Sequence, residues 1–427
     1  MKKRLTALLL ALTLLSALAV GIAADEQTEE TAAETAQTTP DAAGTLSFEN
    51  LGARMRAESY SLLVLEENIA AIESMDYDKL EEELRDKLNE TADSQWKAAQ
   101  LGSLSSNPGI PYDPVAILGS SVSKLMGMSL QQQYDAYREA FDDLRDGNLQ
   151  QDNADLVRQL RATEDKAVMM GETLYITLLG LEEQSAALAR QDAALGRTVE
   201  ELELRYQLGQ ISAMTLQQTR SGREQLQSGK ATLEVNIAAL RRQLNAMVGE
   251  DLTAPLVLGA LPAVTAEQLA AMDVEKDLER AKNASYDLYA AKLTLDDADE
   301  KFEDSGAKYS YNEKDYKNVQ AKHTWQAAQY TYNAAVQNFE LSFRSLYDSV
   351  KNYAQILTAA QTALECERAD LAAAQLKYEQ GTISANALHT AEDDLYTAQD
   401  TVSGAERDLF TAYNNYRWAV DRGLLNG

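Results

Sequence analysis

The octapeptides RYQLGQIS (residues 205–212) and KYEQGTIS (residues 377–384) are two versions of one sequence, placed 172 positions apart. The fifth position of each is a glycine, Gly209 or Gly381, where a helix readily ends in the left-handed conformation. Three residues later, Ser212 or Ser384 can cap a second helix by accepting a hydrogen bond from one of its free N–H groups. Each octapeptide therefore predicts a tight turn between two antiparallel helices.

A helical hairpin alone explains the glycine and the serine, but not the other shared residues. Tyr206 and Tyr378 recur in the same register, and so do Ile211 and Ile383. A glycine lets a partner backbone come close, and an aromatic side chain beside it offers a large, stiff contact. The alternative is that both tyrosines only pack inside their own hairpins, and the sequence leaves the two interpretations open.

The repeat extends well beyond the octapeptides. A shift of 172 residues superimposes two copies of 77 residues, 173–249 and 345–421. Before each octapeptide, seam positions recur at alternating spacings of three and four, which is the heptad pattern of coiled coils. They are Leu174, Leu178, Leu181, Ser185, Leu188, Asp192, Leu195, Val199, Leu202 and Tyr206 in the first copy, and Leu346, Val350, Tyr353, Leu357, Ala360, Leu364, Glu367, Leu371, Ala374 and Tyr378 in the second. The polar members suit a helix whose neighbour is partly hydrated.

Composition agrees with a helical chain and narrows the possible partners. The 427 residues include only 6 prolines and 21 glycines, and the abundant Ala, Leu, Gln, Glu and Lys are good helix formers. The net charge of −28 repels nucleic acid and anionic lipid headgroups, so neither is an expected partner. We therefore predict an all-α protein of duplicated long antiparallel helical hairpins, with membrane contact left open.

Nothing in the sequence indicates catalysis. The single cysteine, Cys366, cannot form an internal disulfide, and His323 and His389 lack a Cys or carboxylate cluster at ligand spacing. Carboxylate runs such as Glu81–Glu83 fall in helical stretches, where a solvated face is the expected explanation. We expect neither an enzyme nor a cofactor or metal site.

The chain begins with the pattern of a secretory signal. Three basic residues, an apolar run and a small-residue exit predict a signal peptide over residues 1–24 and export of the remainder. Residues 25–46 are acidic and rich in Thr and Ala, which predicts a flexible tether. The folded part is expected to consist of a first helical half, a linker and a second helical half, at residues 47–249, 250–264 and 265–427.

In this order of elements, from residue 47 to residue 424, the chain resembles the TolC-type outer-membrane efflux factors. The resemblance rests on the duplicated octapeptide and the heptads before it. It implies a homotrimer whose protomers form a hollow α-barrel, a conduit that exports small molecules or proteins together with an adaptor and a pump. It also implies that the tips dock the hairpin of a periplasmic-type adaptor through Tyr206, Gly209, Ile211, Ser212, Tyr378, Gly381, Ile383 and Ser384.

Two features depart from this family. Its members place membrane strands between helices of each half, and such strands need ~9–11 residues of alternating pattern. The Gly/Ser/Pro-rich insertion 90–127 and the shorter segment 304–318 lack that pattern, so we expect little or no β-barrel. In addition, Ala387 and Thr390 stand where well-studied members carry aspartates at the pore entrance.

These departures leave a second function and location open. The alternative is a secreted or cell-envelope helical scaffold that has lost the membrane part. The expected location is the outer membrane if the source has one, and otherwise the cell surface or the medium. An aromatic-rich segment could serve as a sugar-binding strip or could thicken a helix seam; its residues are Tyr309, Tyr311, Tyr316, Trp325, Tyr330 and Tyr332.

Overall fold

The structure is a computed structural model that describes residues 41, 42, 44–103, 114–312 and 314–425. The predicted signal peptide and most of the predicted tether lie outside the described residues. The chain divides into two compact units. Glu67–Arg158 belongs to the first, and the second combines Thr38–Glu66 with Gln159–Gly427.

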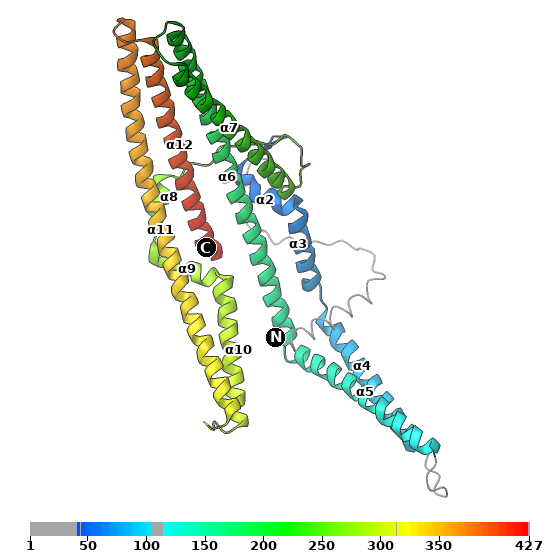
Figure 1. Cartoon of the computed structure of the whole chain (residues 1–427). Helices are drawn as coiled ribbons and strands as arrows, with labels where there is room; N and C mark the ends of the chain where they lie inside the picture. The colour runs from blue at the N-terminus through cyan, green and yellow to red at the C-terminus, as the bar shows by residue number, and fades with distance from the viewer. Residues whose placement is uncertain (1–40, 43, 104–113, 313, 426–427) are drawn as a thin grey trace. The chain divides into compact units, whose positions relative to one another are not determined.

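Long α-helices make up almost all of the described chain (Figure 1). The helices are α2 (Phe48–Glu58), α3 (Tyr60–Glu73), α4 (Tyr77–Ser103), α5 (Pro114–Arg145), α6 (Asn148–Gln207), α7 (Ala213–Met247), α8 (Ala266–Ala271), α9 (Val274–Ala284), α10 (Tyr286–Lys308), α11 (Tyr316–Glu379) and α12 (Ala385–Arg422), and the strands are β1 (Thr45–Leu46) and β2 (Val257–Leu258). The 60 residues of α6 and the 64 of α11 make rods of about 90 and 96 Å at ~1.5 Å per residue. The predicted all-α class with long hairpin helices is confirmed.

The first unit is built around a hairpin of α4 and α5. Gln95 on α4 donates from Nε2 to Oε1 of Gln131 on α5 at 3.2 Å, and the Ser123 hydroxyl donates to the backbone carbonyl of Ala98 at 2.7 Å. Ala98 and Leu84 are buried. The hairpin is therefore a closely packed helix pair over the described parts of both helices.

The second unit contains two further hairpins, α6 with α7 and α11 with α12. On α6, the carboxylate of Asp192 accepts hydrogen bonds from Arg223 Nε at 2.9 Å and from Gln227 Nε2 at 3.0 Å, both on α7. The hydrogen bond from Arg223 lowers the pKa of Asp192 below its ordinary value. The polar seam position thus meets a cation, while the apolar seam residues Leu178 and Val350 are buried.

The two halves begin with the same backbone device. Ser59 ends α2 and Ser285 ends α9 with φ/ψ of −72/116° and −70/116°, and both side chains are buried. The helix that returns from each tip then ends at a left-handed glycine. A Cβ at Gly249 would lie 2.6 Å from the Glu58 carbonyl oxygen, and one at Gly423 would lie 2.3 Å from Ser285 Cα. Only glycine allows these close contacts, so the duplication seen in the sequence is also a duplication of packing.

Two buried clusters hold the second unit together. The cluster of the first half includes Phe48, Tyr175 and Leu244, and the cluster of the second half includes Phe343 and Tyr416. Phe48 packs edge-on against Tyr175, with ring centroids 5.6 Å apart. Each cluster joins the short first helix of its half, α2 or α9, to long helices of the hairpin that follows it.

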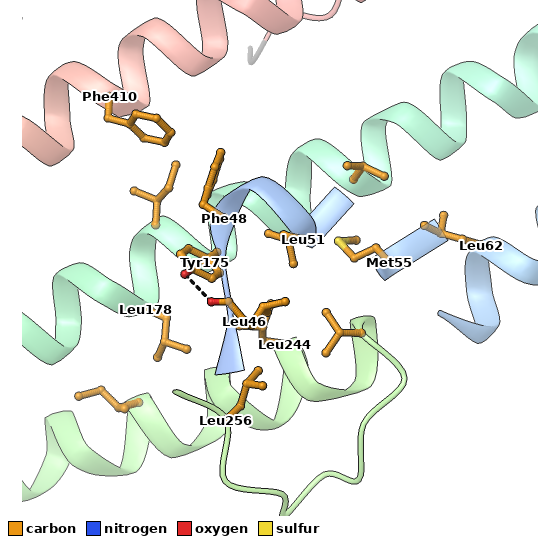
Figure 2. Close-up of a cluster of buried hydrophobic side chains, with 14 residues drawn as sticks. Leu46, Phe48, Leu51, Met55, Leu62, Tyr175, Leu178, Leu244, Leu256 and Phe410 are labelled. Carbon is orange, nitrogen blue, oxygen red and sulfur yellow. Dashed lines mark hydrogen bonds between the residues drawn. The ribbon is translucent and has the colours of Figure 1, made fainter. Parts of the chain in front are cut away.

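A small clasp joins the start of the first half to the linker between the halves (Figure 2). Strand β1 pairs in parallel with β2, so that the Leu46 carbonyl accepts from the Gly259 N–H at 2.8 Å. The hydroxyl of Tyr175, on α6, lies 2.8 Å from the carbonyl oxygens of both Leu46 and Gly259, and its single proton is shared between them. Burial raises the pKa of Tyr175 to about 12. This is the only sheet among the described residues.

The segments that join helices within each half are helical where the structure describes them. In the predicted insertion 90–127, α4 runs to Ser103 and α5 starts at Pro114, with residues 104–113 outside the described ranges. In the second half, residues 304–318 form the end of α10, a turn and the start of α11.

The aromatic-rich segment divides between the two predicted roles. Trp325 on α11 stacks on Phe302 of α10 with ring centroids 5.4 Å apart, so it thickens the helix seam. Tyr311, Tyr316 and Tyr330 are exposed.

Candidate docking tips

Both octapeptides end their helices with the same hydrogen bonds. At the first tip, the Gly209 N–H donates to the Tyr206 carbonyl at 2.9 Å, and the Gln210 N–H donates to the Arg205 carbonyl at 2.9 Å. At the second tip, Gly381 and Thr382 repeat this pattern on the carbonyls of Tyr378 and Lys377. These are the two bonds of a Schellman motif, which satisfies carbonyls left free at a helix end.

Glycine is required in this motif for its backbone angle. Gly209 has φ of +71° and Gly381 has φ of +68°. A Cβ at either position would meet no atom within 4 Å. The shared glycine therefore serves the left-handed conformation, not a tight contact within the chain.

The serines start the return helices as predicted from the sequence. The Ser212 hydroxyl oxygen accepts from the Thr215 N–H at 3.1 Å, and that of Ser384 accepts from the Ala387 N–H at 3.2 Å. Basic residues in the last turn before each tip, Arg205 and Lys377, lie where the helix dipole favours positive charge. Local chemistry therefore fixes both turns.

The shared tyrosines are accessible at both tips. The exposed fraction is 46% for Tyr206 and 44% for Tyr378. Ile211 and Ile383 are half-buried. The tyrosines are thus partly packed and partly open, which leaves about half of each side chain available to a partner.

The two tips lie side by side at one end of the second unit (Figure 1). Asn386, at the start of α12, donates to the Glu201 carboxylate near the end of α6. A ladder of ion pairs between α6 and α12 continues away from the tips at heptad spacing, through Arg197–Asp393 at 2.6 Å, Arg190–Asp400 and Glu183–Arg407. Each pair is partly exposed and therefore contributes little alone, but together they set the register of the two hairpins.

The tips share a backbone but differ in their exposed side chains. Leu208 and Met214 of the first tip are 63% and 68% exposed. At the equivalent positions of the second tip, 172 residues later, stand Gln380 and Asn386. The first tip therefore presents a more apolar surface than the second.

Chemistry other than binding has little support among the described residues. They contain no cluster of three or more His, Cys, Asp or Glu side chains that could hold a metal ion. None of the helices in the described part of the chain is long and apolar enough to cross a membrane. Cys366 is exposed on α11, and His389 contacts Glu392 of its own helix at 2.9 Å.

Two solved structures share this fold. The outer-membrane channel OprN matches with a TM-score of 0.52 and 13% sequence identity, over 94% of this chain and 99% of that chain. A membrane protein from Pseudomonas aeruginosa matches with a TM-score of 0.51 and 14% identity, over 87% of this chain and 90% of that chain. Comparison of the sequence with protein-family models and with curated proteins gives no match. The fold is therefore that of the TolC-type outer-membrane channels, as the sequence resemblance implied, and it is a fold of transport proteins and not of enzymes.

Some features of this site were not predicted from the sequence. The exposed Leu208 and Met214 fall between seam positions and attracted no attention there. The α6–α12 ladder joins residues about 200 positions apart in the chain, and only the recurrence of Arg190 and Arg197 at heptad spacing could have indicated it.

Proposed function

We propose that this chain is a protomer of a helical conduit in the cell envelope, which exports small molecules or proteins together with an adaptor and a pump. The observation that carries the proposal is the pair of equivalent tips, side by side at one end of a unit with the channel fold. Both are closed turns with an accessible tyrosine, so two similar surfaces are offered at one place.

The proposed docking surface consists of Tyr206, Gly209, Ile211 and Ser212 with Tyr378, Gly381, Ile383 and Ser384. The glycines are open to solvent, which allows a partner backbone to approach, and the half-exposed tyrosines supply apolar area with a polar end. The proposed partner is the helical hairpin of a periplasmic-type adaptor. We further propose a homotrimer, and export by the predicted signal to the outer membrane or, in a source without one, to the cell surface or the medium.

Cross-linking in the native host tests the docking role. A photo-reactive amino acid replaces Tyr206 or Tyr378 in separate variants, and a matched variant carries it at Tyr330, which is 71% exposed on α11 away from the tips. Defined adducts from both tip positions but not from Tyr330 are expected. Equal adducts from all three positions, or none from the tips, contradict docking there.

The oligomeric state is tested by light scattering after gel filtration of the mature chain. A mass near three times that of the protomer is expected at micromolar concentration. A strict monomer that also gives no tip adducts contradicts the conduit.

The second candidate, a helical scaffold of the cell envelope, rests on the helical structure of the described segments that join helices within each half. A monomer that still gives specific tip adducts favours this scaffold over the conduit.

A further inference from the structure

The end of the α4–α5 hairpin exposes large apolar side chains. Trp96 on α4 is 63% exposed, and on α5 the exposed residues are Val122, Leu125, Met126 and Met128. Large apolar residues grouped on a protein surface indicate an interaction site, whereas single ones do not. The group lies on one side of the hairpin for a geometric reason.

The four α5 residues point away from α4. At 3.6 residues per turn they fall within an arc of about 160° on the helix surface. Ser123 and Gln131, which bond to α4, lie on the opposite side of α5. The apolar face is therefore the one that the hairpin leaves uncovered within its own unit.

This end of the hairpin is also unusually poor in charge. Residues 96–128 contain three charged residues in 33, Lys97, Asp113 and Lys124, although 25% of the whole chain is charged. Their sum is +1 in a chain whose net charge is −28. A surface that only needed to stay hydrated in this acidic protein would carry more carboxylates, so the composition selects for an uncharged environment.

We propose that the apolar face of α5, with Trp96, inserts into the headgroup region of a phospholipid bilayer. An interfacial helix buries Trp and Leu side chains on one face while Lys side chains stay at the polar boundary. Lys97 and Lys124 are exposed beside the apolar group, where their long stems can reach lipid phosphates. Because the rest of the chain is acidic, a zwitterionic bilayer fits this face and an anionic one offers no advantage.

The second half has aromatic residues at the corresponding connection, between α10 and α11. Tyr311 and Tyr316 are 59% and 71% exposed, and Tyr311 adopts a left-handed φ of +50° that is unfavourable for a bulky residue. Its ring packs against Gly306, where a Cβ would lie 2.1 Å from the ring. Exposed tyrosines are typical of membrane–water interfaces, so this connection agrees with the proposal while the α5 face carries it.

Vesicle flotation tests the proposal with the full mature chain and phosphatidylcholine vesicles. The wild type is expected to float with the vesicles, and Leu125→Glu with Met128→Glu to lower the partition coefficient at least tenfold. Leu341→Glu is the matched control, because Leu341 on α11 is 70% exposed and Leu125 is 73% exposed. Circular dichroism confirms that helix content is unchanged in each variant.

Tryptophan fluorescence identifies the part of the chain that binds. Vesicles are expected to shift the wild-type emission to the blue, and Trp96→Phe is expected to abolish the shift while the protein still floats. The proposal is overturned if the wild type does not float or if the double variant floats as well as the wild type. It is also overturned if the wild type self-associates without vesicles and only the double variant does not, since a second copy then covers the face.

These outcomes are independent of the conduit function. The proposal concerns residues of the first unit, whereas the tip cross-links concern the second. Loss of flotation with intact tip adducts removes only the lipid contact, and intact flotation without tip adducts removes only the docking role.

Discussion

Replacing Gly209 with alanine should destabilise the first tip, whereas replacing Gly222 with alanine should stabilise the chain. Both glycines are on the path of the first hairpin, and a Cβ at either would meet nothing within 4 Å. The difference lies in the backbone, because Gly209 has φ of +71° and Gly222 lies inside α7. The left-handed conformation costs an L-residue about 1–2 kcal/mol, while alanine in a helix is better than glycine by roughly 0.5–1 kcal/mol.

Hydrogen exchange of the peptide that contains Gln210 measures this effect where it acts. The Gln210 amide is bonded to the Arg205 carbonyl in the turn, so a cost of 1–2 kcal/mol should raise its exchange about 5- to 30-fold. Gly222→Ala should leave that exchange unchanged and should raise the urea midpoint slightly. Equal or slower exchange at Gln210 in Gly209→Ala would refute the argument from the backbone angle.

Three further changes test the contacts that hold the second unit. Tyr175→Phe should cost about 1–3 kcal/mol, because the Gly259 carbonyl loses its partner; since the pKa of Tyr175 is raised to about 12, wild-type stability should also fall between about pH 10 and 12, and less so in the variant, as urea unfolding at both pH values shows. Asp192→Asn should flatten the acid dependence below about pH 4, because the lowered pKa of Asp192 stabilises the fold above the unfolded-state pKa and this contribution disappears as the pH falls; an unchanged acid profile contradicts it. Arg190→Asp should destabilise by less than about 1 kcal/mol, and adding Asp400→Arg should restore the loss in a double-mutant cycle.

The tips could be predicted from the sequence because their causes are local. Gly209 and Ser212 act on bonds within six residues of themselves, and the structure places both bonds where the octapeptide indicated. The duplicated helices were predictable for a related reason, since the heptad pattern is a property of one helix at a time. The match of Ser59 with Ser285 likewise reflects a cap that each short helix makes on its own.

The clasp and the α4–α5 hairpin could not be predicted in the same way. Tyr175 bonds to segments that are 129 and 84 residues away, and no local pattern distinguishes it from other seam residues. In residues 90–127, Gly and Ser lower helix propensity, so composition alone could not decide whether the segment is ordered. Only the spacing of Val122, Leu125 and Met126 indicates a helix there, and it is too short a signal to stand alone.

Duplication fixed the backbone of the two tips but not their surfaces. The Schellman bonds and serine caps are the same in both because they depend on backbone angle and on one hydroxyl. Leu208 and Met214 differ from Gln380 and Asn386 because exposed positions do not affect the turn and are free to change. Asn386 contacts Glu201 of the first hairpin, so one of the changed residues links the tips while its counterpart Met214 stays open to solvent. If the tips dock one partner, the apolar contact falls on the first tip, and Leu208→Gln should weaken tip cross-links from Tyr206 more than Gln380→Ala weakens those from Tyr378.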